Sequence, residues 1–166
     1  MKNLNITTQK IGLTAAAALF AACLPLSATA GTSGDFHGAT PDKGQYNVIF
    51  HLDTGGTPAI KKTLNNIENI LHDPRLAGKL HVALIANSKG FDVYVKNNGF
   101  EAKLKHLQAQ GVIRAQGANA RKELHTDRKE LYPFIRSVPS GMGEITIREG
   151  QGWAYIHPTA PHEQQL

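Results

Sequence analysis

The feature of the sequence that most constrains its fold is an alternation of short apolar runs with segments of helical periodicity. The first run, residues 46–52, is apolar at both odd and even positions, as in a strand that is covered on both faces. Apolar residues then repeat at helical spacing from Ile60 to Leu71, with Thr57 as the predicted cap and Pro58 in the first turn. The two segments together predict a buried strand that leads into an amphipathic helix.

The same alternation of apolar runs and helical segments continues to residue 156. Strands are predicted over 80–86, 112–115, 134–138 and 153–156, helices over 100–111 and 140–149, and a capped helical turn at Asp127. Residues 91–96 have no clear preference, and Ile145-Thr146-Ile147 favours a strand by propensity although it lies in a predicted helix. Strands that alternate with helices predict an α/β fold with a mostly parallel five-stranded sheet and helices on both of its faces.

The first thirty residues differ in composition from the rest of the chain. Lys2 and Lys10 precede an uncharged, Ala-rich run over 11–26, and Ala28-Thr29-Ala30 places small residues where signal peptidase reads. This layout predicts a signal peptide over 1–30, cleavage after Ala30, and a periplasmic or secreted protein. The apolar run is too short to span a bilayer comfortably, so no membrane span is predicted.

Cys23 is the single cysteine of the chain and lies inside the predicted signal peptide. It follows Phe20-Ala21-Ala22, which loosely resembles the processing site of bacterial lipoproteins, so acylation of Cys23 is an alternative to cleavage at Ala30. Either way, we expect no free thiol in the exported protein. An intrachain disulfide, a cysteine-based zinc site and a two-cysteine redox motif are excluded.

The remaining sequence divides into three parts. Residues 31–44 are rich in Gly, Thr, Ser and Asp and predict a flexible lead-in, 45–158 form the domain, and 159–166 predict a flexible tail. The chain carries 18 Lys and Arg against 13 Asp and Glu, a mild excess of positive charge. Because no basic motif with interleaved aromatic residues accompanies it, nucleic acid is not a predicted partner.

Polar residues follow the predicted strands, where ligands gather in parallel sheets. These residues offer neutral hydrogen-bonding groups that suit a small polar ligand, and they include no activated nucleophile, so no catalytic residue is assigned. The candidate ligand-binding residues are His51, Asn87, Gln116, Asn119, Ser140 and Gly141.

Two further interpretations concern the same end of the sheet. Gly55-Gly56-Thr57 at a helix start suits either an anion site or a tight turn that needs a positive φ. His51 could instead serve an enzyme that uses a metal or another cofactor, although no pair of the 8 histidines has the spacing of an H-E-x-x-H motif. No metal ligand is assigned, and the cofactor stays unknown.

Five segments in a fixed order resemble the DsrE/DsrF-like sulfur-relay family, in particular its exported members. They are His51-Leu52-Asp53 at the end of the first strand, 64–71, 107–112, Val138-Pro139-Ser140-Gly141, and Gly152-Trp153-Ala154-Tyr155-Ile156-His157-Pro158. The resemblance covers residues 45–158. It implies a flavodoxin-like (DsrE-like) α/β sandwich and assembly into a homo-oligomer, a trimer or a hexamer.

The resemblance also exposes one departure from the family. Members that carry sulfur form a persulfide on a cysteine in the turn after the third strand, and the matching position here is Gln116. A persulfide needs a thiolate, and a carboxamide cannot replace it. We therefore expect a non-catalytic ligand-binding or accessory subunit in a sulfur- or redox-linked system, with the His51-dependent enzyme as the alternative.

Overall fold

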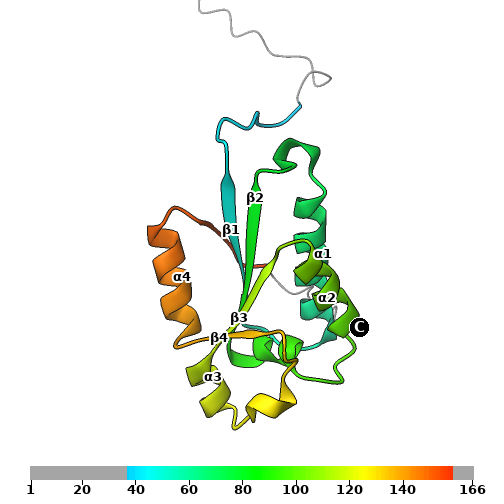
Figure 1. Ribbon diagram of the computed structural model, residues 1–166, viewed down its shortest axis with the longest axis vertical. Coiled ribbons are helices and arrows are strands. Elements are labelled where there is room, and N and C mark those ends of the chain that lie inside the picture. The colour runs from blue at the N-terminus through cyan, green and yellow to red at the C-terminus, as the bar shows by residue number, and fades with distance from the viewer. Residues whose placement is uncertain (1–36, 159–166) are drawn as a thin grey trace, which may run out of the picture. The chain divides into compact units, whose positions relative to one another are not determined.

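The computed structural model describes residues 37–158, which contain a five-stranded sheet with flanking helices (Figure 1). The strand order is β4-β3-β2-β1-β5, and every neighbouring pair is parallel. The strands are β1 (Tyr46–Leu52), β2 (Leu80–Ala86), β3 (Ile113–Gly117), β4 (Arg136–Val138) and β5 (Ala154–Ile156). The predicted α/β fold is confirmed, and its arrangement is flavodoxin-like.

Helices cover both faces of the sheet, as predicted. The α-helices are α1 (Thr57–Leu71), α2 (Glu101–Ala109), α3 (Ala118–Glu123) and α4 (Gly141–Gly150), and the 3₁₀ helices are η1 (Pro74–Leu76), η2 (Ser88–Tyr94) and η3 (Arg128–Glu130). Figure 1 shows α1 and α2 on one side of the sheet and α4 on the other. We call these two sides the α1 face and the α4 face.

Side chains from alternate strand positions build a separate core on each face. Phe50 and Leu52 of β1 join the larger core on the α1 face, with Leu64 of α1 and Leu104 of α2. Ile49 of β1 belongs instead to the smaller core on the α4 face, which includes Ile145 of α4. His51, two residues after Ile49, therefore has its side chain on the α4 face.

The order of the strands reverses at β1. The chain moves from β1 through β2 and β3 to β4, and α4 then returns it to β5 on the free side of β1. Because parallel crossovers are right-handed, reversing the direction of travel along the sheet moves the connecting helix to the opposite face. This return places the last strand beside the first, with Ile49 opposite Tyr155 and Phe50 opposite Ile156.

The start of α1 differs in one detail from the prediction. Thr57 is the first helical residue and not the cap, because Gly56 occupies the cap position with φ of 87° and no side chain caps the helix. The positive φ confirms the tight-turn interpretation of the Gly55-Gly56 pair. It leaves the anion-site interpretation without a test.

Residues 91–96, which show no sequence preference, lie mostly in η2. Gly90 in this helix packs against the end of β1, since a Cβ built there would meet the Leu52 carbonyl and would lie 2.9 Å from Asp53 N. Fully buried Tyr94 donates its hydroxyl hydrogen to Leu84 O at 2.8 Å. Burial raises the pKa of Tyr94, so the phenol stays neutral and acts as a donor.

Elements near the end of the chain show where the prediction fails. β3 runs to Gly117, two residues beyond the predicted strand, because Ala115 to Gly117 pair with β4. The predicted strand over 134–138 begins only at Arg136. Helix α3 was missed because it is short and buries only Ala120, so it has no apolar periodicity.

The predicted caps in this region are confirmed. Asp127 and Glu130 form a capping box at η3, and the Ser140 side chain accepts a hydrogen bond from Gly143 N at the start of α4. The Ser140 cap and the buried Ile145 side chain hold residues 145–147 in a helix despite their preference for a strand.

Several predictions concern segments outside the described residues. The signal peptide over 1–30, Cys23, residues 31–36 of the lead-in and the tail over 159–166 all lie there. Residues 37–44 contain no helix or strand. Within residues 37–158, no helix has the length and apolarity to cross a membrane.

Candidate functional site

His51 is the centre of a polar cluster on the α4 face. It is the second-to-last residue of β1 and is only 7% exposed, and both of its ring nitrogens have partners. Nδ1 is 2.6 Å from the Tyr155 hydroxyl and Nε2 is 2.7 Å from Asn87 Oδ1. Because the Asn87 oxygen can only accept, Nε2 carries the hydrogen, and Nδ1 accepts from Tyr155.

Asp53 and His157 lie next to His51 and pair with each other. His157 Nε2 is 2.8 Å from Asp53 Oδ1, which also accepts a hydrogen bond from Thr54 Oγ1 at 3.0 Å. The rings of His51 and His157 are 5.3 Å apart between centroids. The cluster therefore joins one carboxylate to two imidazoles.

The neighbours of Asp53 decide its ionisation. Burial alone raises the pKa of this carboxyl, but the hydrogen bonds from His157 and Thr54 outweigh it, so the pKa is lowered. Asp53 is therefore a carboxylate at neutral pH. Burial, together with Asp53 and Glu149, raises the pKa of Tyr155, which keeps its proton for His51.

Strand register explains why these side chains meet. Ile49 pairs with Tyr155 across β1 and β5, and continuing that register by two residues places His157 beside His51. Asp53 follows His51 by two positions and so shares its face. Asn87 directly follows β2, whose last residue Ala86 pairs with Leu52 of β1.

The structure brings some of the predicted residues together with His51. A Cβ built on Gly141 would lie 3.6 Å from Asn87 Cβ, and one built on Gly117 would lie 2.7 Å from Gly141 N and 2.5 Å from Asn119 Oδ1. Asn87, Asn119 and Gly141 thus line one continuous edge. Ser140 belongs to the same edge but uses its hydroxyl to cap α4.

Gln116 is separated from this group. Its side chain is fully buried and donates from Nε2 to Ser137 Oγ at 2.9 Å, while Oε1 has no partner. Ala115 faces the α4 core, so Gln116 faces the opposite side of the sheet. The predicted site therefore divides, with Gln116 on the α1 face and the other five residues on the α4 face or its edge.

Three members of the cluster were not among the predicted site residues: Asp53, Tyr155 and His157. The His51-Leu52-Asp53 spacing was a usable signal, because residues two apart on a strand share a face. Tyr155 and His157 could have been found only from the pairing of β5 with β1, which depends on the strand order.

The cluster has the donors of a metal site. Among the described residues, one ligand atom each from His51, Asp53 and His157 can be chosen so that all three lie within 4.8 Å of one another. Two imidazole nitrogens and a carboxylate oxygen are a common ligand set for transition metals. The same groups can also hydrogen-bond a small polar molecule.

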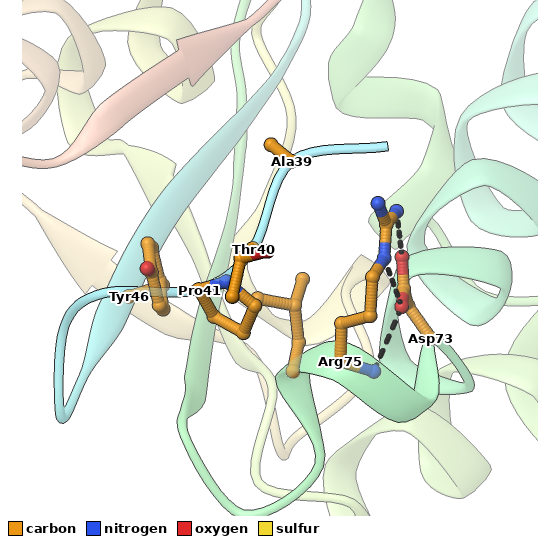
Figure 2. Close-up of a pocket in the computed structure, with 7 residues that line it drawn as sticks. Ala39, Thr40, Pro41, Tyr46, Asp73 and Arg75 are labelled. Atoms are coloured by element: carbon orange, nitrogen blue, oxygen red, sulfur yellow. Dashed lines mark hydrogen bonds and ion pairs between the residues drawn. The ribbon is translucent and has the colours of Figure 1, made fainter. Parts of the chain in front are cut away.

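A separate pocket lies at the opposite, amino-terminal end of β1 (Figure 2). It has a volume of about 190 Å³ and is lined by residues that include Pro41, Tyr46 and Leu76. Its two charged side chains, Asp73 and Arg75, bind each other at 2.7 Å, as the dashed lines in Figure 2 show. Because each charge is already paired, the pocket offers a ligand less than the His51 cluster does.

Comparison with known proteins supports the fold and leaves the function open. The sequence matches no protein-family model and no curated protein. The structure is similar to that of MTH1491 from Methanobacterium thermoautotrophicum, a protein of unknown function, with a TM-score of 0.60 and 27% sequence identity. The match covers 69% of this chain and 100% of that one.

Proposed function

We propose that the protein is an exported, DsrE-like binding protein that holds a small polar ligand at the carboxyl edge of its sheet, as an accessory subunit of a sulfur- or redox-linked system. One observation carries the proposal: His51 is fixed between Tyr155 and Asn87, beside the neutral edge formed by Asn119 and Gly141. A rigid polar edge of this kind suits recognition of a ligand.

The placement of the family-like segments supports the resemblance. His51-Leu52-Asp53, Val138-Pro139-Ser140-Gly141 and the segment 152–158 are far apart in the chain, yet each contributes a residue to this edge or to the cluster beside it. Segments that resemble one family and meet at one edge are consistent with a shared binding role.

The proposal excludes sulfur transfer through a protein thiol. The position that matches the family's persulfide cysteine is Gln116, a buried amide that cannot form a persulfide. The only cysteine, Cys23, lies in the predicted signal peptide. The function of the exported chain then rests on binding.

The proposed protein is a homo-oligomer, a trimer or a hexamer by the family resemblance. Two large apolar side chains on α4 are exposed, Met142 at 45% and Ile147 at 59%. We expect both side chains to be covered by a neighbouring copy in the assembly.

A second candidate function is an enzyme that uses His51 with a metal or another cofactor. The contact of His157 with Asp53 beside His51 favours it, because this arrangement supplies ligands and a proton acceptor at one place. It differs from the first candidate in requiring turnover of the bound molecule.

Native mass spectrometry of the protein isolated from its own exported compartment tests the proposal. We expect an oligomer in which each chain retains one small molecule, and we expect the variant His51→Gln to lose it. The matched control is His81→Gln, at an exposed histidine near the other end of β2, which should keep the molecule. Equal retention by His51→Gln and the wild type, or an added sulfur mass on the mature chain, would refute the proposal.

A further inference from the structure

We propose that His51, Asp53 and His157 bind a divalent first-row transition metal ion, with zinc as the reference case. The inference rests on the proposed binding edge, and it names the class of ligand that binds at His51. It assigns a function to Asp53 and His157, two residues outside the predicted binding site.

The donor atoms are already close to the arrangement that an ion needs. The three candidate ligand atoms lie within 4.8 Å of one another, and ligands about 2.0–2.2 Å from one zinc ion are separated by about 3–4 Å. His157 Nε2 and Asp53 Oδ1 are 2.8 Å apart, so they would have to separate only by about 1 Å or less to bind one ion together. The site would form by this small separation and by an approach of the His51 nitrogen, which lies within 4.8 Å of both other ligand atoms.

The contacts of His51 define which nitrogen faces the ion. Its Nε2–H is directed at Asn87 Oδ1 on the β2 side, and its Nδ1 lone pair is directed toward β5, the strand that leads to His157. A metal-bound histidine usually donates its other ring hydrogen to a protein oxygen, which fixes the tautomer. Asn87 has that role here, and the Tyr155 hydroxyl at Nδ1 is the group that the ion would displace or recruit.

Asp53 has an orienting contact of the same kind. Thr54 Oγ1 donates to Asp53 Oδ1 at 3.0 Å, so the carboxylate is held by a neighbour other than the two imidazoles. Outer contacts of this type are typical of metal ligands, and they hold the first ligands in position before the ion arrives.

Exposure provides a route for the ion. His51 is buried, whereas the side chains of Asp53 and His157 are 37% and 39% exposed. An ion can thus enter from solvent and meet the two exposed ligands before the buried one. Because only three protein ligands are present, a fourth position stays open for water or for a small polar ligand.

The donor set also selects among metals. Calcium and magnesium prefer oxygen ligands in larger numbers, so one carboxylate with two imidazoles suits them poorly. Imidazole nitrogen with carboxylate oxygen suits zinc, cobalt, nickel and iron. Cobalt is therefore a useful probe, since it replaces zinc and has visible absorption bands.

The test is a titration of chelator-treated, untagged protein with Co²⁺, followed by visible absorption and by competition with Zn²⁺. We expect one ion per chain and new absorption bands. We expect at least about tenfold weaker binding in His157→Gln and in Asp53→Asn, because each replaces a strong ligand by a neutral carboxamide, which is a weaker donor for these metals. Both side chains are partly exposed, so both variants should keep the wild-type circular dichroism spectrum.

The matched control is again His81→Gln, which removes an imidazole outside the cluster and should bind Co²⁺ like the wild type. The inference is overturned if the wild type binds no saturating ion, or if His157→Gln and His81→Gln bind equally. Retention of a small molecule by metal-free protein would leave the proposed function standing without the metal. Metal binding by a protein that retains no small molecule would support the metal site and refute the proposed small-molecule ligand.

Discussion

His51 shows how a single residue can be predicted correctly while its surroundings are not. The sequence places it at the end of a buried strand, where ligands gather, and the structure confirms that position. Its partner Asn87 is also a predicted residue, because it directly follows the adjacent strand. Tyr155 and His157 were not predicted, since no local pattern shows that the last strand pairs with the first.

Gln116 shows the opposite case. Its place after the predicted third strand put it in the candidate site, but pairing with β4 extends β3 through this residue. A residue inside a strand has a fixed face, and for Gln116 that face is the one away from His51. An error of two residues in a strand end therefore moved one side chain to the wrong side of the sheet.

Gly90 gives a prediction at the residue scale. In Gly90→Ala the added Cβ would collide with the backbone of Leu52 and Asp53, which cannot yield as a side chain would. We expect the free energy of unfolding to fall by about 3 kcal/mol, measured by urea denaturation. The control Gly44→Ala, where nothing lies within 4 Å of the new Cβ, should change it by less than about 0.5 kcal/mol. Equal stability of the two variants would contradict the packing described here.

At the scale of elements, the strands were predicted from apolar runs and the helices from an apolar period or a cap, whereas α3 and η2, which offer neither signal, were not predicted. The 15-residue α1 has a full apolar stripe, and its predicted end at Leu71 is confirmed, although it begins at Thr57, the residue predicted as its cap. Helices α3 and η2 lack such a stripe. Contacts with neighbouring elements decide their positions instead, and a local sequence pattern does not reveal those contacts. For η2 the decisive contact is that of Gly90 with β1.

The turn after α1 gives a prediction of pH dependence. Asp73 caps η1, and the hydrogen bonds from the Arg75 side chain and backbone lower its pKa from 3.8 to about 2. A lowered pKa means that the carboxylate stabilises the fold above about pH 3.8, and that this contribution is lost as the pH falls toward 2. The stabilisation is therefore complete at neutral pH, and its dependence on pH is confined to the acid range.

Carbon-13 chemical shifts of the carboxyl groups, followed against pH, measure this effect. We expect an Asp73 midpoint near 2 in the wild type and a rise toward 3.8 in Arg75→Gln, which removes the guanidinium. Asp127, which caps η3 with Lys129 as its partner, should keep its midpoint in that variant. A wild-type Asp73 midpoint close to 3.8 would show that the ion pair does not form in solution.

At the scale of the whole molecule, the site depends on the strand order. The return of the chain through α4 puts β5 beside β1, and this pairing alone brings His157 to His51. The sequence predicted a parallel sheet but not the order of its strands, because that order is decided by long-range packing on both faces. The fold class could thus be predicted, whereas the complete site could not.

The central claim is that His51, Asp53 and His157, at the pairing of β1 with β5, form a metal-binding site. X-ray diffraction at the zinc absorption edge, from crystals grown with Zn²⁺, tests it most directly because it locates the ion itself. The account predicts that the strongest anomalous peak lies about 2.0–2.2 Å from a nitrogen of His51, a nitrogen of His157 and a carboxylate oxygen of Asp53. A strongest peak at another histidine, such as His81 or His106, with none between these three residues, would contradict it.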